Sequence, residues 1–106
     1  MTSIRIAQTA SKGREVFRQI LTLRTEVEKV VLGLGKRAHN ARMALSLLYR
    51  KPIINAGDVE QALSVSTPTA NALINALVQL GILTEITGQQ RWRSYAFKRY
   101  LNLFLS

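Results

Sequence analysis

The chain has 106 residues, 47% of them hydrophobic, no cysteine, and a formal charge of +9. This size allows one domain of ordinary dimensions, the lack of cysteine excludes disulfides and thiolate metal sites, and no apolar run reaches the roughly 18 to 20 residues of a membrane span. Through Lys51 the charge balance is +8, and from Pro52 onward it is +1, so the basic character belongs to the N-terminal half.

The first predicted element is a long amphipathic helix. Its apolar residues recur at alternating steps of four and three and share one stripe, which consists of Val16, Ile20, Leu23, Val27, Val30 and Leu34. We expect this stripe to pack on the next helix, because fewer than three heptads is short for an independent coiled coil. Residues 1–11 are predicted to be a flexible tail. Gly33 and Gly35 predict the end of the helix.

A second helix is predicted before Pro52, which blocks its continuation. Its apolar stripe consists of Ala38, Ala41, Ala44, Leu45, Leu47 and Leu48. Three basic residues are expected to face water: Lys36, Arg37 and Arg42. His39 is the single histidine, and without a second histidine or a cysteine to complete a metal site it is predicted to be a surface residue. Residues 12–51 are therefore assigned to a two-helix segment.

Capping signals define the next elements. Ile53 and Ile54 form a β-prone pair suited to a brief strand. Asn55 is predicted to cap a short helix over residues 56–63, and Asp58 lies at the position that completes an approximate capping box. After a turn, Ser66 is predicted to cap a longer helix.

The longer helix is predicted to run to Leu80 and to end at Gly81. Residues 82–86 and 92–97 then read as the two strands of a hairpin, and the second strand places Arg93, Tyr95 and Phe97 on one face. Residues 98–106 are predicted to form a short amphipathic helix packed on the core.

This order of elements indicates the fold class. A short helix, a turn, a longer helix and a β-hairpin are the parts of a winged helix-turn-helix domain, here over residues 52–106. The whole chain is thus predicted to be mainly α with a small β-hairpin, with two N-terminal helices preceding the winged helix-turn-helix.

The longer helix carries the candidate contact surface. At about 100° per residue, the predicted core positions are Ala70, Leu73, Ile74, Leu77 and Leu80. The opposite side carries Pro68 and the residues predicted to contact a nucleic acid or a protein, which are Thr67, Asn71, Ala72, Asn75 and Gln79. Asn and Gln can bond adenine edges, and a small apolar residue can touch a thymine methyl group. No charged residue occurs from Thr67 to Leu80, so autonomous DNA affinity is expected to be modest.

Two further groups of residues could join this surface. The predicted wing consists of Gln89, Gln90, Arg91, Trp92 and Arg93, which can contact a phosphate backbone, a minor groove or a protein. Trp92 has the equal alternative of packing on the domain. The second group is the basic set of the N-terminal helices, Lys36, Arg37 and Arg42. A basic surface suits nucleic acids, anionic membranes or acidic proteins, and the charge does not choose among them.

Catalytic patterns are missing from the sequence. It contains no Gly-rich phosphate loop, no metal-ligand spacing, and no serine or cysteine in a recognisable motif with histidine. Asp58 and Glu60 are better explained by capping and the helix dipole than as a carboxylate pair. We expect no catalysis, no cofactor and no metal in this chain.

Several stretches of the sequence resemble one protein family. The stretch KPIINAGDVEQALSVSTPTANALINALVQLGILTEITGQQRWRSYAFKRYLNLF resembles the C-terminal winged-helix domain of Fic-family proteins. Upstream, FRQILTLRTEVEKVV and ARMALSLLYRKP are similar to the helices that join the Fic catalytic core to that domain. Fic proteins transfer AMP or a related nucleotide moiety to hydroxyl side chains through an H-P-F-x-x-G-N-G-R-type loop. That loop is absent here, and His39 in RAHNARM does not match it, so the resemblance implies a C-terminal fragment of a longer protein.

The functional hypothesis is a non-catalytic recognition module of a Fic-type protein. Its predicted partners are double-stranded DNA, bound weakly, a target protein, or the Fic catalytic domain. One alternative is a free-standing transcriptional regulator that dimerises through residues 16–34, and another is a purely structural dimerisation domain. A cytoplasmic location without a membrane partner is expected for each.

Overall fold

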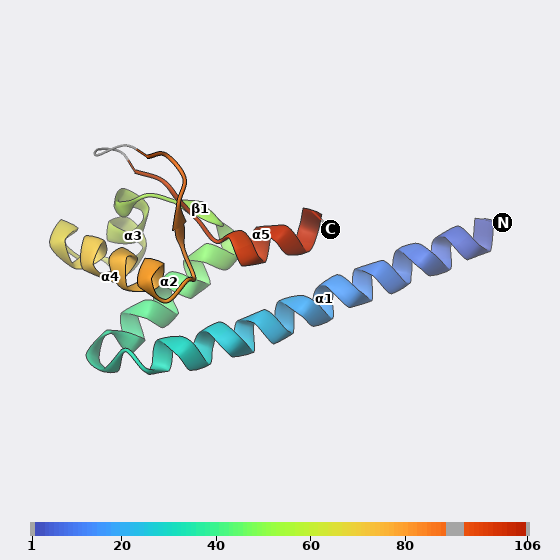
Figure 1. Cartoon of the computed structure of the whole chain (residues 1–106), viewed down its shortest axis with the longest axis horizontal. Helices are drawn as coiled ribbons and strands as arrows, with labels where there is room; N and C mark the ends of the chain where they lie inside the picture. Colours follow the sequence, from blue (N-terminus) through green and yellow to red (C-terminus); the bar gives the residue numbers. More distant parts are fainter. Residues whose placement is uncertain (1, 89–92, 106) are drawn as a thin grey trace.

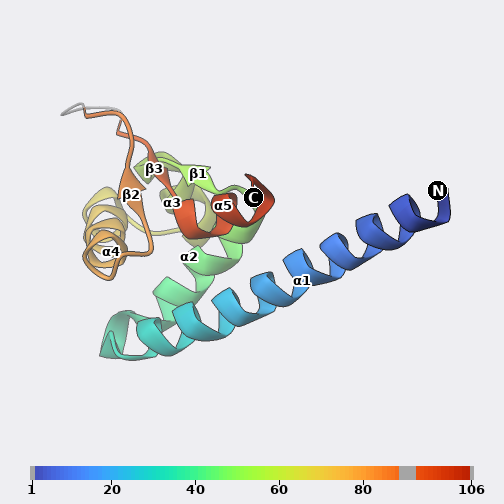
Figure 2. The same ribbon diagram turned by 45° about the vertical axis from the view of Figure 1, so that its right-hand side comes forward.

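The computed structural model describes residues 2–88 and 93–105 and is mainly helical, with a small antiparallel sheet (Figure 1). The elements in chain order are α1 (Thr2–Leu32), the 3₁₀ helix η1 (Gly35–Arg37), α2 (Ala38–Arg50), β1 (Ile53–Ile54), α3 (Ala56–Leu63), α4 (Thr67–Gln79), β2 (Thr84–Glu85), β3 (Tyr95–Ala96) and α5 (Lys98–Leu105). The helix α1 runs past the other elements at its N-terminal end (Figures 1 and 2). Within residues 2–88 and 93–105, none of the helices has the length and apolarity of a bilayer-crossing segment.

The three strands form one sheet in the order β1–β3–β2, with both pairs antiparallel. Ala96 of β3 lies opposite Ile53 on one side and Thr84 on the other, and Tyr95 lies opposite Ile54 and Glu85. The returning strand of the hairpin is therefore the centre of the sheet. This pairing brings the start of α3, which follows β1, close to the hairpin that follows α4.

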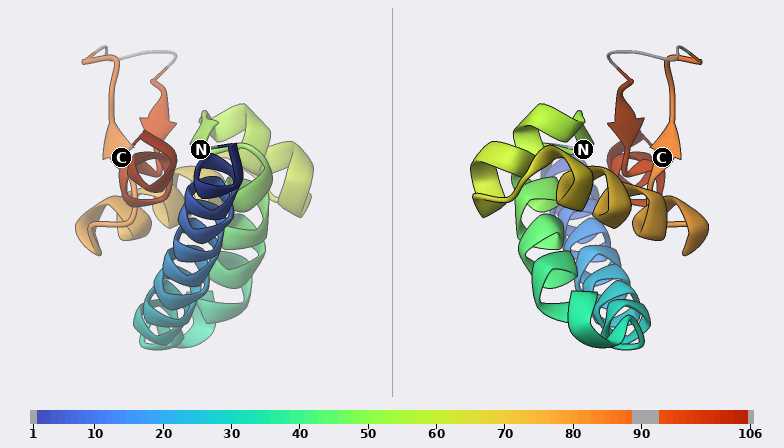
Figure 3. Two further views of the ribbon diagram at one scale, coloured as in Figure 1. Left: turned by 90° about the vertical axis from the view of Figure 1, so that its right-hand side faces the viewer. Right: turned by 90° about the vertical axis from the view of Figure 1, so that its left-hand side faces the viewer.

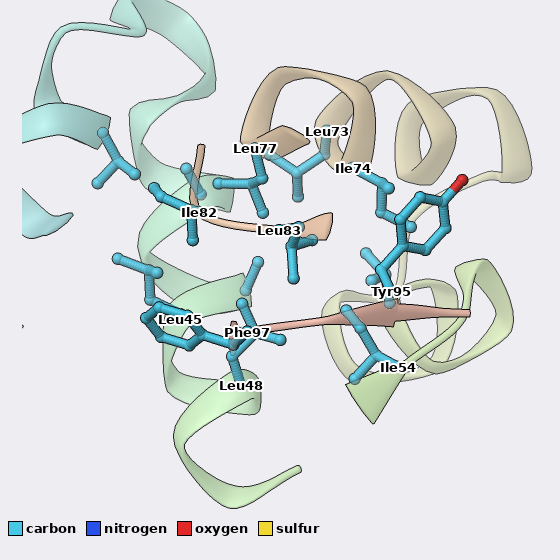
Figure 4. Packing of buried hydrophobic residues seen from close by; sticks show 14 of the residues in the cluster. Leu45, Leu48, Ile54, Leu73, Ile74, Leu77, Ile82, Leu83, Tyr95 and Phe97 are labelled. Atoms are coloured by element: carbon cyan, nitrogen blue, oxygen red, sulfur yellow. The ribbon is translucent and has the colours of Figure 1, made fainter. Parts of the chain in front are cut away.

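One hydrophobic core joins the helices to the sheet. Figure 4 shows the Phe97 ring beside Leu45 and Leu48 of α2, and Ile82 and Leu83 beneath α4. All of these side chains are at most 3% exposed. Because interiors pack at nearly crystalline density, these contacts fix how α2, α4 and the sheet lie relative to one another.

The first helix differs from its prediction in two ways. It begins at Thr2, so residues 2–11, expected to be a tail, are helical. Val30, placed on the predicted stripe, is 43% exposed, whereas Val31 is fully buried. The buried positions Leu23, Val27 and Val31 are four residues apart, so the contact line rotates about 40° around α1 at each step, as i±4 ridges do when helices cross obliquely.

The turn after α1 and the second helix follow their predictions. Gly35 has a φ of 64°, a conformation that glycine adopts without strain, and α2 ends at Arg50, before Pro52. Of the predicted apolar stripe, Ala41, Ala44, Leu45 and Leu48 are buried, and Ala38 and Leu47 are half-buried. His39 is exposed, as expected.

The caps of α3 and α4 are confirmed. The Asn55 side chain accepts a hydrogen bond of 2.9 Å from the Asp58 N–H, and the Asp58 carboxylate accepts one of 2.9 Å from the Asn55 N–H. Ser66 accepts a bond of 3.4 Å from the Thr69 N–H at the start of α4. Gly81, with a φ of 78°, follows the C-cap residue of α4.

Asp58 also contacts Lys51, whose ammonium lies 3.0 Å from the carboxylate. Burial raises the pKa of Asp58, but the hydrogen bond from the Asn55 backbone and the charge of Lys51 outweigh it. The net pKa is therefore below the ordinary value. The ionised carboxylate thus stabilises the start of α3.

One predicted core position of α4 is wrong. Leu80 is 36% exposed, because the chain turns at Gly81 and buries Ile82 and Leu83 instead. The N–H groups of these two residues donate to the Leu77 carbonyl at 3.0 and 3.2 Å, which holds them under the helix end.

The hairpin strands are shorter than predicted, two residues each. Tyr95 and Phe97 are buried, as their shared face implied, but Ala96 between them is buried too because β3 is the central strand. Arg93 is exposed.

The last helix packs against α1. Arg99 forms an ion pair with Glu26, and Leu103 packs on the core. The Tyr100 hydroxyl donates a 3.2 Å hydrogen bond to the Tyr49 carbonyl of α2. Phe104 is 55% exposed. The prediction of a short helix packed on the core is confirmed for its inner residues.

Candidate nucleic-acid interface

The helix α4 lies across one face of the molecule, between the β-hairpin and the turn that joins α1 to α2 (Figure 3, right). Its N-cap and Pro68 in the first turn set where it starts, and the buried side chains of Leu73, Ile74 and Leu77 set which side faces inward. The side chains left outward include Thr67, Asn71, Asn75 and Gln79, which are all exposed, while Ala72 is half-buried. The predicted outward orientation is therefore confirmed for four of the five candidate residues.

A groove of about 530 Å³ separates α4 from α3 and the hairpin. It is lined by Asn55, Ala56, Gly57, Glu60, Asn71, Asn75, Arg93 and Tyr95. Figure 4 shows the Tyr95 ring beside Ile74 of α4, so this aromatic side chain forms the floor between sheet and helix. Two amides of the candidate surface thus share a groove with one predicted wing residue. We call it the hairpin-side groove.

Acidic residues lie near Arg93, the positively charged residue that lines the hairpin-side groove. Arg93 lies 3.6 Å from the Glu85 carboxylate, which also accepts a 2.7 Å hydrogen bond from the Gly88 N–H. Glu60 accepts a hydrogen bond from the Thr67 hydroxyl at the start of α4. The hairpin-side groove therefore has little net positive charge among the described residues.

The opposite flank of α4 faces the turn between α1 and α2. One hollow there, of about 350 Å³, is lined by Leu34, Arg37, Ala72, Asn75, Ala76, Gln79 and Leu80. A second, of about 260 Å³, is lined by Arg37, Asn40, Pro68, Thr69, Ala72 and Leu73. We call these two the turn-side hollows. Arg37 and Ala72 line both, and Asn75 lines the hairpin-side groove as well.

The three sets of predicted contact residues are brought together only in part. Of the basic set, Arg37 joins α4, whereas Lys36 and Arg42 are exposed but line neither turn-side hollow. Of the wing set, Arg93 reaches the hairpin-side groove. The predictions for Gln89, Gln90, Arg91 and Trp92 lie outside the described residues.

Sequence reasoning missed three features of this surface. The sequence indicates a capping and helix-dipole role for Glu60, whereas in the structure Glu60 lines the groove beside α4. The sequence indicates only a strand face for Tyr95, which also lines this groove, and no role for Asn40, which lines a turn-side hollow. The spacing of Glu60 and Thr67 gives no local signal, because the turn between α3 and α4 decides which faces of the two helices meet.

A different polar group is buried near α1. Among residues 2–88 and 93–105, none forms a hydrogen bond with the Tyr49 hydroxyl, and the Arg24 guanidinium lies 4.6 Å from the centre of the Tyr49 ring. Burial raises the pKa of Tyr49, and the nearby Arg24 charge opposes that effect. This residue belongs to an aromatic cluster with Phe97 and Tyr100 and stabilises the packing of α2 on α5.

Within residues 2–88 and 93–105, no three His, Asp or Glu side chains gather as metal ligands. Comparison of the whole chain with known proteins identifies no matching family model, no similar curated protein and no similar solved structure.

Proposed function

We propose that the chain is a winged helix-turn-helix module whose α4 face binds double-stranded DNA weakly and with little sequence preference. The observation that carries this proposal is the row of exposed amides on α4 between the hairpin and the turn. The order α2–β1–α3–α4–β2–β3, with β3 between β1 and β2, supports the fold part of the proposal, because winged domains have this arrangement.

The dimensions and chemistry of α4 suit a major groove. An α-helix with side chains is about 10–12 Å across, and the major groove of B-DNA is about 12 Å wide. Asn71, Asn75 and Gln79 can donate to and accept from base edges there. Since α4 carries no charge, phosphate contacts must come from its flanks, and a small number of such contacts gives weak binding that salt weakens further.

The test is to titrate a labelled duplex with the whole chain and to measure binding by fluorescence anisotropy at salt concentrations between about 50 and 200 mM. We expect a dissociation constant in the micromolar range or weaker near physiological salt, similar for unrelated duplexes, as for non-specific DNA binders. Tight binding to a single operator at physiological salt contradicts the low sequence preference.

A matched pair of variants tests the α4 face itself. Asn75→Glu places a negative charge on the face, whereas Asn102→Glu places the same charge on an exposed position of α5. Repulsion by phosphates lowers affinity at least about tenfold for the first variant and much less for the second. Equal losses indicate that only net charge matters and remove α4 from the interface.

The proposal has two further parts: the chain is non-catalytic, and it is related to the C-terminal domains of Fic proteins. The relation to Fic proteins rests on the sequence of α4 and the hairpin. An H-P-F-x-x-G-N-G-R-type motif encoded upstream in the same reading frame supports it, and a complete reading frame without the motif opposes it. For the first part, we expect no transfer of labelled nucleotide by this chain alone.

A second candidate function is dimerisation through α1. It is favoured by the helix running beyond the other elements with Phe17 63% and Leu21 48% exposed (Figure 1). Sedimentation of the chain and of Phe17→Lys separates the candidates. A dimer that the substitution dissociates supports a dimeric regulator or a structural dimerisation domain, whereas a monomer at all concentrations excludes both.

A further inference from the structure

The position of Arg37 links the N-terminal helices to α4. Arg37 ends η1, and its side chain lines both turn-side hollows, next to Pro68 at the start of α4 and next to Gln79 at its end. It is exposed. A helix without any charge of its own thus has an arginine beside its outward face, in both turn-side hollows.

Arg37 differs from Arg93 in its electrostatic environment. Within the part of the chain that the structure describes, no carboxylate lies within ion-pair distance of the Arg37 guanidinium, whereas Glu85 lies 3.6 Å from Arg93. A phosphate that approaches Arg93 competes with Glu85, and Glu60 in the same groove repels it. A phosphate that approaches Arg37 meets no such competition.

The backbone that presents Arg37 is fixed. Val31 is fully buried at the end of α1, and the half-buried Leu34 packs against the core. Gly35 makes the turn, and the Arg37 N–H donates a 3.3 Å hydrogen bond to the Leu34 carbonyl. The side chain therefore starts from an anchored position, which lowers the entropy lost when it holds a ligand.

From these observations we propose that Arg37 is the phosphate anchor for the DNA strand on the turn side of α4, so that the helical hairpin of α1 and α2 is part of the duplex-binding surface. This inference rests on the proposed function. In it, α4 enters the major groove and Arg37 contacts the backbone of one strand. Bidentate phosphate contact suits the planar guanidinium.

The experiment compares the variants Arg37→Ala and Arg42→Ala. Arg42 is an exposed arginine of α2 that lines neither turn-side hollow. Both variants lose one positive charge, so net charge is matched. We expect Arg37→Ala to weaken duplex binding about five- to tenfold at low salt and to reduce the slope of log K against log salt by about 0.9, the contribution of one phosphate. Arg42→Ala should change the slope by much less. Arg37→Lys, which keeps the positive charge, should retain most of the wild-type slope.

The outcomes separate the inference from the function on which it rests. Duplex binding that Arg37→Ala and Arg42→Ala weaken equally overturns the anchor and leaves the DNA-binding module intact. A wild-type chain that binds no duplex but binds an acidic polypeptide such as polyglutamate overturns both. Circular dichroism of each variant confirms that the helices are retained, which is expected for exposed positions.

Discussion

Among the residues that the structure describes, the two flanks of α4 differ in charge although Asn75 belongs to both. On the hairpin side, Arg93 is paired with Glu85, and Glu60 lies in the same groove. On the turn side, Arg37 is the charged residue of both hollows. The comparison teaches that a cation close in sequence to α4, such as Arg93, can be paired with a carboxylate, whereas a more distant one, such as Arg37, is not within ion-pair distance of any described carboxylate.

The difference has a physical origin. Glu85 lies opposite Tyr95 in the sheet, and Arg93, two residues before Tyr95, is its diagonal neighbour, so the two charges pair and largely neutralise each other. The α1–α2 turn precedes α4 by some thirty residues, and the packing of α2 against α3 and α4 brings it there. The core contacts of the N-terminal helices therefore determine the electrostatics of the turn side.

The largest effect we expect is on the anchoring of the turn. Val31→Ala removes a fully buried side chain at the end of α1 and should lower the free energy of unfolding by about 2 kcal/mol. Val30→Ala, next to it and 43% exposed, should cost less than about 0.5 kcal/mol. Urea unfolding followed by circular dichroism measures both. A larger loss at Val30 would mean that the stripe predicted from the sequence is the buried one.

The next effect concerns the α3 wall of the hairpin-side groove and depends on pH. The pKa of Asp58 is lowered in the folded state, so its stabilising contribution is complete above the ordinary value of 3.8 and is lost as the pH falls through the lowered folded value. Asp58→Asn should lower stability by about 1 kcal/mol at neutral pH, as for other capping residues. The difference between the two proteins should shrink in acid. Thermal unfolding from neutral pH to below 3.8 tests this, and a constant difference contradicts it.

A smaller effect is expected where the flanks meet. Asn75→Arg adds a cation to the face that both flanks share and should strengthen binding to any duplex about fivefold, with a steeper salt dependence. Anisotropy titration at two salt concentrations measures both quantities. Unchanged affinity would argue that this face does not meet the duplex.

The smallest effect is expected from removing a negative charge on the hairpin side of α4. Glu60→Gln removes a negative charge from the hairpin-side groove and should raise duplex affinity two- to threefold, an effect of roughly 0.5 kcal/mol typical of partly screened charges. Glu15→Gln is the control, because it removes the same negative charge from an exposed position of α1 that does not line the groove. An equal gain in affinity with the control would assign the effect to net charge instead.

Much of the fold follows from local signals that act over a few residues. The caps at Asn55 and Ser66 and the glycine turns at Gly35 and Gly81 lie where the sequence placed them. Each depends on hydrogen bonds or backbone angles within four residues, which is why they can be read without the tertiary structure. The outward orientation of Asn71 and Asn75 follows from helical periodicity in the same way.

The predictions of burial fail where contacts between different elements determine which side chain is buried. Whether Val30 or Val31 is buried depends on the angle at which α2 crosses α1, and the exposure of Leu80 depends on Ile82 and Leu83 filling the core below it. Neither is a property of one helix. A hydrophobic stripe identifies a face to within one residue, and the neighbouring element selects among its members.

The sequence by itself determined the caps, the glycine turns and the uncharged outward face of α4, because these depend on residues close together in the chain. Only the tertiary structure decided which charges flank that face. Arg37, Lys36 and Arg42 are equivalent as sequence, yet Arg37 alone of the three lies in the hollows beside α4. Long-range packing makes that selection, since a helical hairpin turns each side chain toward a different neighbour.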